Sequence, residues 1–192
     1  MSLIIENLKE ALIGETKAQK KYSLYAKKAL EENHQEIAHL FKAVAFAEGI
    51  HIKNHKRALS LLTDSDINLQ DFIEIDEKEI KKKVGDTISN LEDAIEGEIY
   101  ETKKMYKKFE KNAKSLGDEV AELSFSLARD AERVHADLFS LCQKKLKKGE
   151  KIEIRKIFVC QICGNVEFDA PPEICPVCDH SKDFYKEIEA PN

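Results

Sequence analysis

Apolar side chains recur at alternating three- and four-residue intervals through most of the first 148 residues. This is the period of a helix with one buried face. The same stretch contains no proline and only five glycines, a composition typical of helices. Gly117 followed by Asp118 predicts a helix end and a new N-cap. The pattern therefore predicts four long helices, over residues 4–32, 34–62, 87–115 and 118–147.

The segment 63–86 interrupts this period. It carries three polar residues at 64–66 and then an extended-looking run at 72–75. We expect a long connection across the molecule, with a short helix over 77–84. The links before and after it are short, so the helices on each side form antiparallel hairpins. Two hairpins joined by one long crossover give the connectivity of a ferritin-like four-helix bundle, and the predicted fold class is all-α.

The composition changes after about residue 150. All four prolines and four of the five cysteines lie beyond it, among aromatic and β-branched residues. The charged stretch 144–151 ends the last helix and serves as a linker. The sequence therefore predicts two domains, a helical bundle over 1–150 and a small metal-binding domain over 151–192.

Charge and hydropathy argue against several classes of partner. The 192 residues carry a formal net charge of -5 with both signs interspersed, which disfavours nucleic acid or an acidic membrane surface. No apolar run approaches the roughly 18 residues of a transmembrane helix, and the N-terminus lacks the pattern of a signal peptide. We therefore expect no nucleic-acid or membrane partner and a cytoplasmic location.

Ionisable residues stand on the otherwise apolar stripes of the four predicted helices. Burying a carboxylate without a partner charge costs far more than a helix recovers, so these positions require cations. Clustered carboxylates and imidazoles suit a pair of iron or manganese ions. The predicted ligands are Glu15, Glu48, His51, Glu98, Glu101, Glu132 and His135.

Helical phase selects these ligands among several Glu-x-x-His sequences. The chain holds four such pairs, and with so many acidic residues some arise by chance on solvated faces. Glu48 with His51 falls within the apolar stripe of its helix, as Glu132 with His135 does in the last helix. His39 falls on roughly the opposite face. Only the two pairs in phase with the stripe are predicted to face the bundle interior.

The charges of the predicted ligands suggest individual roles. Two ferrous ions carry four positive charges, which four glutamates balance. Glu101 is a fifth glutamate on the same face as Glu98, so we infer an optional ligand that exchanges with a neutral histidine as the redox state changes. Glu48 and Glu132, each beside a histidine ligand, are the predicted bridging carboxylates.

The two halves of the bundle also resemble each other. Tyr22 follows Glu15 after seven residues and Tyr106 follows Glu98 after eight, so both tyrosines return to the inner face. They are predicted to donate hydrogen bonds to carboxylates or to a bound oxygen species, with an ordinary core position as the alternative. The spacings are consistent with a duplicated helical hairpin around a pseudo-twofold axis.

Three further residues are assigned no ligand role. His55 lies one turn after His51 and is predicted to support the site or the bundle end. Cys142 is predicted to be a buried core cysteine. His180, beside a cysteine pair, is expected to be exposed.

Two Cys-x-x-Cys knuckles lie eleven residues apart, Cys160 with Cys163 and Cys175 with Cys178. Two knuckles place four sulfur atoms around one ion, and without a secretory signal they indicate a metal site rather than disulfides. Iron is favoured because a redox site shares the chain, and structural zinc is the alternative.

Taken together, these motifs resemble the rubrerythrin family over essentially the whole chain. The matching stretches are GETKAQKKY at 14–22, AEGIH at 47–51, GEIYE at 97–101 with Met105 and Tyr106, AERVH at 131–135, and the two cysteine knuckles. The resemblance implies a ferritin-like di-iron bundle followed by a rubredoxin-like Fe(Cys)4 domain.

The resemblance also implies an activity. Members of the family are non-haem peroxidases that reduce hydrogen peroxide to water in oxidative stress defence. Electrons would pass from NAD(P)H, through a reductase or a separate rubredoxin, to the Fe(Cys)4 centre and then to the di-iron site. The catalytic set would be the seven carboxylate and histidine ligands with Tyr22 and Tyr106, and one iron would move between His51 and Glu101 with oxidation state. Head-to-tail homodimers would place the rubredoxin-like domain of one subunit beside the di-iron site of the other.

Two other classes remain open at this stage. A ferroxidase that oxidises and stores iron would use the same bundle, but it takes electrons from iron itself and does not need a cysteine relay. A zinc-loaded structural or binding protein would carry no redox chemistry, and metal analysis distinguishes it. An oxygen reductase would differ from the peroxidase only in its preferred oxidant.

Overall fold

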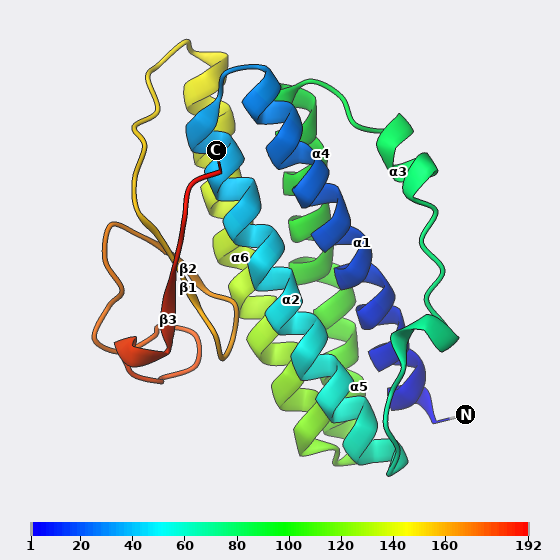
Figure 1. The fold of residues 1–192 in the computed structure, drawn as a ribbon. Helices are drawn as coiled ribbons and strands as arrows, with labels where there is room; N and C mark the ends of the chain where they lie inside the picture. The colour runs from blue at the N-terminus through cyan, green and yellow to red at the C-terminus, as the bar shows by residue number, and fades with distance from the viewer. Residues whose placement is uncertain (1, 192) are drawn as a thin grey trace.

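The structure, a computed structural model, describes residues 2–191. Long antiparallel helices form a bundle, and a small sheet lies against one side of it (Figure 1). The helices of the bundle are α1 (Leu3–Glu31), α2 (Gln35–Thr63), α4 (Thr87–Tyr100), α5 (Tyr106–Leu116) and α6 (Glu119–Lys147). The predicted four-helix bundle with a small C-terminal domain is confirmed. The outer ends of the four predicted helices lie within one residue of their predictions.

The ends of the helices follow from local chemistry. Gly117 adopts a left-handed conformation with a φ of 72° and ends α5. The Asp118 side chain accepts a hydrogen bond from the Ala121 amide at 2.9 Å and so caps α6. Asp86 caps α4 in the same way, through the Ser89 amide at 2.8 Å. The predicted helix end and N-cap at 117–118 are confirmed.

The sequence predicted one continuous helix over 87–115, and this prediction is wrong. A π-helix, Glu101–Met105, separates α4 from α5. A π-turn accommodates one residue more than an α-turn and is frequently found at functional sites. This extra residue accounts for the unequal spacings noted above, seven residues from Glu15 to Tyr22 but eight from Glu98 to Tyr106.

The crossover between α2 and α4 runs along the outer side of α1 (Figure 1). It contains a 3-10 turn (Leu69–Asp71) and the short helix α3 (Glu77–Lys82), which confirms the predicted short helix. The extended-looking residues 72–75 form no strand in the described part of the chain. Instead Phe72 and Ile73 pack against the apolar cluster of the bundle that contains Phe109 and Phe125.

The C-terminal domain is built on a three-stranded antiparallel sheet in the order β2-β1-β3. Its strands are β1 (Ile157–Cys160), β2 (Val166–Phe168) and β3 (Tyr185–Ile188). Ile157 pairs with Phe168 on one side and with Ile188 on the other. Residues 148–156 link α6 to β1, so the predicted domain boundary near 150 falls in the linker and stays a prediction.

Two apolar clusters fill the bundle, and buried polar residues lie along the same inner faces. One cluster contains Tyr22, Phe41 and Phe139, and it extends to the buried side chains of the sheet. The other contains Phe109 and Phe125. Within residues 2–191, no helix combines the length and the apolar character that a membrane span requires.

Candidate metal centres

Six of the seven predicted carboxylate and histidine ligands converge inside the bundle. They form two groups of four, and in each group the potential ligand atoms lie within 4.8 Å of one another. The groups share two members, Glu48 and Glu132. This sharing is the geometry that a bridging role requires. The first group is Glu15, Glu48, His51 and Glu132, and the second is Glu48, Glu98, Glu132 and His135.

The helical scaffold explains the convergence. Glu48 with His51 on α2, and Glu132 with His135 on α6, are three residues apart, so each pair projects from one face of its helix. Each of the six residues is at most 1% exposed.

The two histidines are oriented by hydrogen bonds at their outer nitrogens. The Nδ1 atom of His51 faces the carboxylates, 2.7 Å from Glu132 Oε1, and that of His135 lies 2.6 Å from Glu132 Oε2. Each Nε2 atom lies 3.0 Å from a backbone carbonyl, that of Cys163 for His51 and that of Gly164 for His135. Because a carbonyl only accepts, Nε2 carries the proton and Nδ1 is left with a lone pair for a metal ion.

Two tyrosines hold carboxylates of the opposite hairpin. Tyr22 of α1 donates to Glu98 of α4, and Tyr106 of α5 donates to Glu15 of α1. This reciprocal arrangement matches the pseudo-twofold relation expected from the sequence. The hydrogen bonds are those predicted for the tyrosines, and the extra residue of the π-helix is what brings Tyr106 inward.

His55 supports this network and belongs to neither ligand group. Its Nε2 atom lies 3.0 Å from the Tyr106 hydroxyl, and its Nδ1 atom lies 2.8 Å from the Ser124 hydroxyl. Burial lowers the pKa of His55, although Glu15 partly offsets the effect. A supporting position one turn below His51 agrees with the prediction.

The cluster needs cations to satisfy its charges and lone pairs. Among the described residues, one oxygen each of Glu15, Glu48, Glu98 and Glu132 is buried without a hydrogen-bond partner. Burial and the neighbouring carboxylates raise the pKa of Glu48 well above its usual range. Buried oxygens without partners are rare in folded proteins, so two bound metal ions fit this site.

We expect the metal-free protein to lose stability as the pH rises from about 5.5 to about 8. Burial raises the pKa of Glu48 and of Glu132 above 4.5, and carboxylates raise that of His51 against the effect of burial. The folded chain then binds more protons than the unfolded chain, so this stability is present at low pH and is lost as the pH rises through the folded pKa values. Glu15 offsets part of the effect: burial alone would raise its pKa, but the charge of His51 and the hydrogen bonds of His51, His55 and Glu48 together lower it.

Bound metal should reverse this pH dependence, so that stability rises with pH, because metal binding requires deprotonated ligands. Thermal melts of metal-free and metal-loaded protein at the two pH values test the expectation. A metal-free protein that melts higher at the more alkaline pH would contradict a cluster of protonated carboxylates.

Glu101 is the predicted ligand that the structure leaves outside both groups. It begins the π-helix and is only half-buried. Its carboxyl lies at the edge of the cluster, where burial and the charges of Glu15 and Glu132 raise its pKa. A Cβ atom on Gly14 would lie 3.5 Å from Glu101 Oε1, an ordinary van der Waals contact, so the Glu101 carboxyl lies beside α1.

The four cysteines form the second candidate centre. The Sγ atoms of Cys160 and Cys178 lie 3.7 Å apart, and those of Cys163 and Cys175 lie 3.6 Å apart. A tetrahedral ion with bonds of about 2.3 Å requires sulfur separations of about 3.8 Å. None of the four is in a disulfide, and burial raises the pKa of Cys178 to about 12. Deprotonated thiols therefore require a bound cation, and the geometry suits one metal ion.

The two centres are in contact within one chain. The carbonyls that accept hydrogen bonds from His51 and His135 belong to the first cysteine knuckle. A third donor, Asn54 of α2, reaches the carbonyl of Ile162 at 2.8 Å. Asn54 was not among the predicted site residues, and no motif surrounds it.

The remaining assignments were mostly correct. Cys142 is 5% exposed in the core and His180 is exposed, as predicted. His39 lies on a face away from the ligands, as predicted, but this face is not open to solvent, since the side chain is 3% exposed. Its Nε2 atom donates to the carbonyl of Ile188 at 2.7 Å, because β3 covers this side of α2.

Two family models match the chain. The model described as rubrerythrin matches residues 6–143, and the one described as the rubredoxin-like domain of rubrerythrin matches residues 158–186. Rubrerythrin-2 of Clostridium acetobutylicum is 35% identical over 182 residues, which are 93% of each chain. Nigerythrin of Nitratidesulfovibrio vulgaris is 33% identical over 186 residues, 94% of this chain and 84% of its own.

Solved structures give the same result. Nigerythrin in a mixed-valence state superposes with a TM-score of 0.85 at 31% identity, covering 98% of this chain and 88% of its own. Nigerythrin in a fully reduced, all-ferrous state gives a TM-score of 0.82 at 30% identity, with the same coverage. The similarity therefore spans both the helical bundle and the cysteine domain.

Proposed function

The chain belongs to the rubrerythrin family, and from this premise we propose that it reduces hydrogen peroxide to water. Each peroxide molecule takes up two electrons and two protons and yields two water molecules. The six clustered carboxylate and histidine residues would hold two iron ions, with Glu101 as an optional ligand, and the four cysteines would hold a third. Iron at these positions would supply the two electrons for O–O cleavage, and the cysteine-bound iron would replace them one at a time.

The observation that carries this proposal is the pair of hydrogen bonds between the centres. His51 and His135 both donate to carbonyls of the first cysteine knuckle, at 3.0 Å. The cysteine centre therefore lies one hydrogen bond away from a ligand of each metal position. A ferroxidase, which draws electrons from its substrate iron, has no use for such a link.

The other residues of the site would hold the ligands in place. Tyr22 and Tyr106 donate hydrogen bonds to Glu98 and Glu15, which fixes the direction of one carboxylate in each half. The ligands are buried between two apolar clusters, so the bundle limits access of bulk water and of competing reactants.

Electrons would enter at the second cysteine knuckle. Cys178 is half-buried, and the apolar side chains of Ile174 and Phe184 nearby in the chain are 55% and 42% exposed. We propose that a separate rubredoxin or an NAD(P)H-dependent reductase binds there. On the same family premise we propose a cytoplasmic location and assembly into a homodimer.

Rapid mixing tests the proposal directly. Anaerobically purified, fully reduced protein of known metal content is mixed with one equivalent of hydrogen peroxide and, separately, with oxygen. We expect peroxide to reoxidise both centres much faster than oxygen does. Slow reaction with peroxide, together with many turnovers of added Fe(II) under oxygen, would identify an iron oxidase instead.

We expect Cys160→Ser to slow steady-state peroxide reduction by at least about tenfold. Mutating a residue that only supports a metal ligand costs about 10–100-fold in metal affinity or activity, and loss of a ligand itself should cost more. A single oxidation of the pre-reduced carboxylate site by peroxide should keep its rate. Cys142→Ala, which removes a buried thiol outside the cluster, is the control. Turnover that is unchanged in Cys160→Ser would show that the cysteine centre is not a relay.

A further inference from the structure

A chain of hydrogen bonds runs from the carboxylate site to α6. The Tyr106 hydroxyl is bonded to Glu15, and Nε2 of His55 lies 3.0 Å from that hydroxyl. On the other side of the imidazole ring, Nδ1 lies 2.8 Å from the Ser124 hydroxyl. The four residues come from α1, α5, α2 and α6, and each is at most 6% exposed. His55 and Ser124 belong to neither ligand group, so ligation does not explain them.

Each hydrogen bond of this chain has one direction. A carboxylate only accepts, so Tyr106 donates to Glu15. The Tyr106 oxygen has then used its one hydrogen and accepts from Nε2 of His55. Cations bound at the adjacent site would oppose a positive charge on this buried ring, so the ring is neutral and Nδ1 carries no hydrogen. Ser124 therefore donates to His55, and all three hydrogens point from α6 towards the ligands.

Among residues 2–191, the other half of the duplicated bundle has no such chain. Four residues after the histidine ligand, one half has His55 and the other has Phe139. Phe139 packs against Tyr22, with ring centroids 5.4 Å apart. His55 packs against Tyr106 in the same way, at 5.5 Å. A phenylalanine can therefore fill this position beside a tyrosine, and packing alone does not explain the imidazole.

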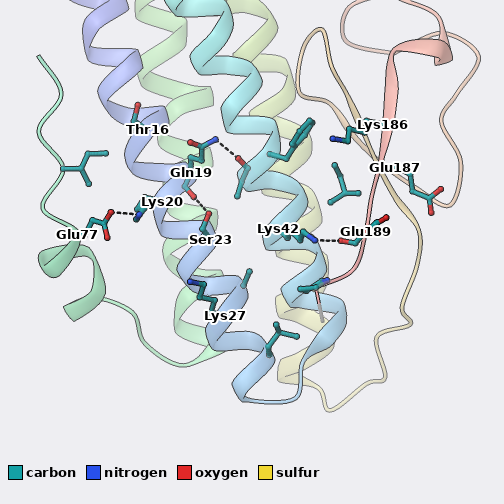
Figure 2. Close-up of a pocket in the computed structure, with 17 residues that line it drawn as sticks. Thr16, Gln19, Lys20, Ser23, Lys27, Lys42, Glu77, Lys186, Glu187 and Glu189 are labelled. Carbon is teal, nitrogen blue, oxygen red and sulfur yellow. Dashed lines mark hydrogen bonds and ion pairs between the residues drawn. The ribbon is translucent and has the colours of Figure 1, made fainter. Parts of the chain in front are cut away.

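A groove beside α1 offers the site no equivalent path. Figure 2 shows this groove, of about 1050 Å³, between α1, α2 and β3. Two of its polar side chains, Thr16 and Gln19, closely follow Glu15 in α1. Thr16 donates to the carbonyl of Leu12 at 2.6 Å. Gln19 donates to the carbonyl of Ala45 at 3.2 Å. Both bonds end on backbone carbonyls, which have no hydrogen to pass on.

We propose that His55 and Ser124 are positioning residues that direct the Tyr106 hydroxyl proton at Glu15 and replace it when peroxide is cleaved. The inference rests on the proposed peroxide reduction, in which each molecule takes up two protons. During cleavage the Tyr106 proton moves to Glu15, which passes it to an oxygen of the cleaved peroxide. The Nε2 proton of His55 moves to the Tyr106 oxygen. The Ser124 proton moves to Nδ1, and water replaces it.

This movement supplies one of the two protons and leaves the His55 ring protonated at Nδ1 instead of Nε2. The opposite movement restores the ring when protons taken up from water during re-reduction reach Glu15. Over a full cycle both protons consumed therefore come from water. The chain of hydrogen bonds provides a proton at the moment of O–O cleavage, whereas electron transfer from the cysteine centre does not depend on it.

The direction of the chain can be tested without any measurement of activity. Zinc-loaded protein with ¹⁵N-labelled histidine is diamagnetic, because Zn²⁺ has a filled d shell. NMR then identifies which ring nitrogen of His55 carries hydrogen, and the signal is assigned by its loss in His55→Phe. We expect hydrogen on Nε2 and none on Nδ1. Hydrogen on Nδ1 would reverse the bond to Ser124, and the inference would be wrong.

Two variants test the role in the reaction. His55→Phe removes both ring hydrogen bonds and copies the packing of Phe139, and Ser124→Ala removes the outer donor alone. We expect each to slow oxidation of the reduced protein by peroxide about 10–100-fold, the usual cost of altering a residue that supports a metal ligand. Reduction of the carboxylate site by the cysteine centre should keep its rate, and the metal content should not change. Ser124→Thr, which keeps the hydroxyl, should recover most of the oxidation rate.

Ser126→Ala is the matched control on α6, because the Ser126 hydroxyl bonds to the Leu123 carbonyl at 3.1 Å, outside the chain of hydrogen bonds. A merely structural role for His55 and Ser124 would slow both half-reactions alike or lower the metal content, and either result would overturn the inference. A parental oxidation rate in either variant would overturn it too. If the wild-type chain itself does not reduce peroxide, the proposed function fails, whereas the NMR result still decides the direction of the hydrogen bonds.

Discussion

Replacing Glu48 with alanine should empty both metal positions of the carboxylate site while the cysteine centre keeps its ion. Glu48 belongs to both ligand groups, and its side chain is fully buried. The substitution therefore removes a ligand from each position at once. It also leaves Glu132 as the one carboxylate that both groups share, so two cations would lie close together with less negative charge between them.

Metal analysis measures this effect. The parent protein should bind about three ions per chain and the variant about one, because the affinity loss should exceed the 10–100-fold that outer-shell changes cause. The visible spectrum of the cysteine centre and the helical circular dichroism should both remain, which separates loss of the site from loss of the fold.

A matched control is available on α1. Glu31 also begins a Glu-x-x-His sequence, but its side chain is 69% exposed. Glu31→Ala should leave the metal content unchanged. Full occupancy of the carboxylate site in Glu48→Ala would show that Glu48 does not bridge the two positions.

The bundle and its ligands could be predicted because both depend on local geometry. A helix repeats every 3.6 residues, so an apolar stripe fixes which Glu-x-x-His pairs face inward. The caps at Asp86 and Asp118 similarly depend on side chains and amides a few residues apart. Such features are determined within a few turns of chain, and the sequence displays them.

The π-helix was missed although a signal was present. The duplicated halves differ by one residue between glutamate and tyrosine, seven in the first and eight in the second. A one-residue excess within a helix that must keep both ends facing inward requires a wider turn. The spacing is also consistent with duplication alone, so the pattern by itself predicts a continuous helix.

The position of the C-terminal domain could not be predicted, for a different physical reason. The donors His39, Lys42 and Asn54 bond to backbone carbonyls, which every residue offers. No residue type on the receiving side therefore marks the interface. Burial of His39 is a consequence of this docking and cannot be derived from its place on α2 alone.

Replacing Gly164 with alanine should separate the cysteine centre from the carboxylate site. Gly164 has a φ of 83°, a conformation that costs an L-residue about 1–2 kcal/mol. An added Cβ atom would lie 2.5 Å from Nε2 of His51 and 3.3 Å from the carbonyl oxygen of Ala47. The His51 ring is buried and its Nε2 atom donates to the Cys163 carbonyl, and Ala47 contributes backbone, so neither can move away cheaply.

The knuckle must then shift outward, and both histidine–carbonyl hydrogen bonds are lost with it. Adding about 1 kcal/mol for each bond to the backbone strain gives a destabilisation of about 3–4 kcal/mol. We also expect slower reduction of the carboxylate site by the cysteine centre, because the path through His51 and His135 is interrupted.

Gly117→Ala isolates the contribution of close approach. Gly117 has a similar φ of 72°, but a Cβ atom there would meet nothing within 4 Å. It should therefore cost only the backbone strain, about 1–2 kcal/mol, and leave electron transfer unchanged. Thermal unfolding and single-turnover reduction of both variants give the comparison. The two variants could instead be equally destabilised, with Gly164→Ala keeping the electron-transfer rate of the parent protein. That result would mean that the knuckle does not lie against His51 and that the two centres are not in contact.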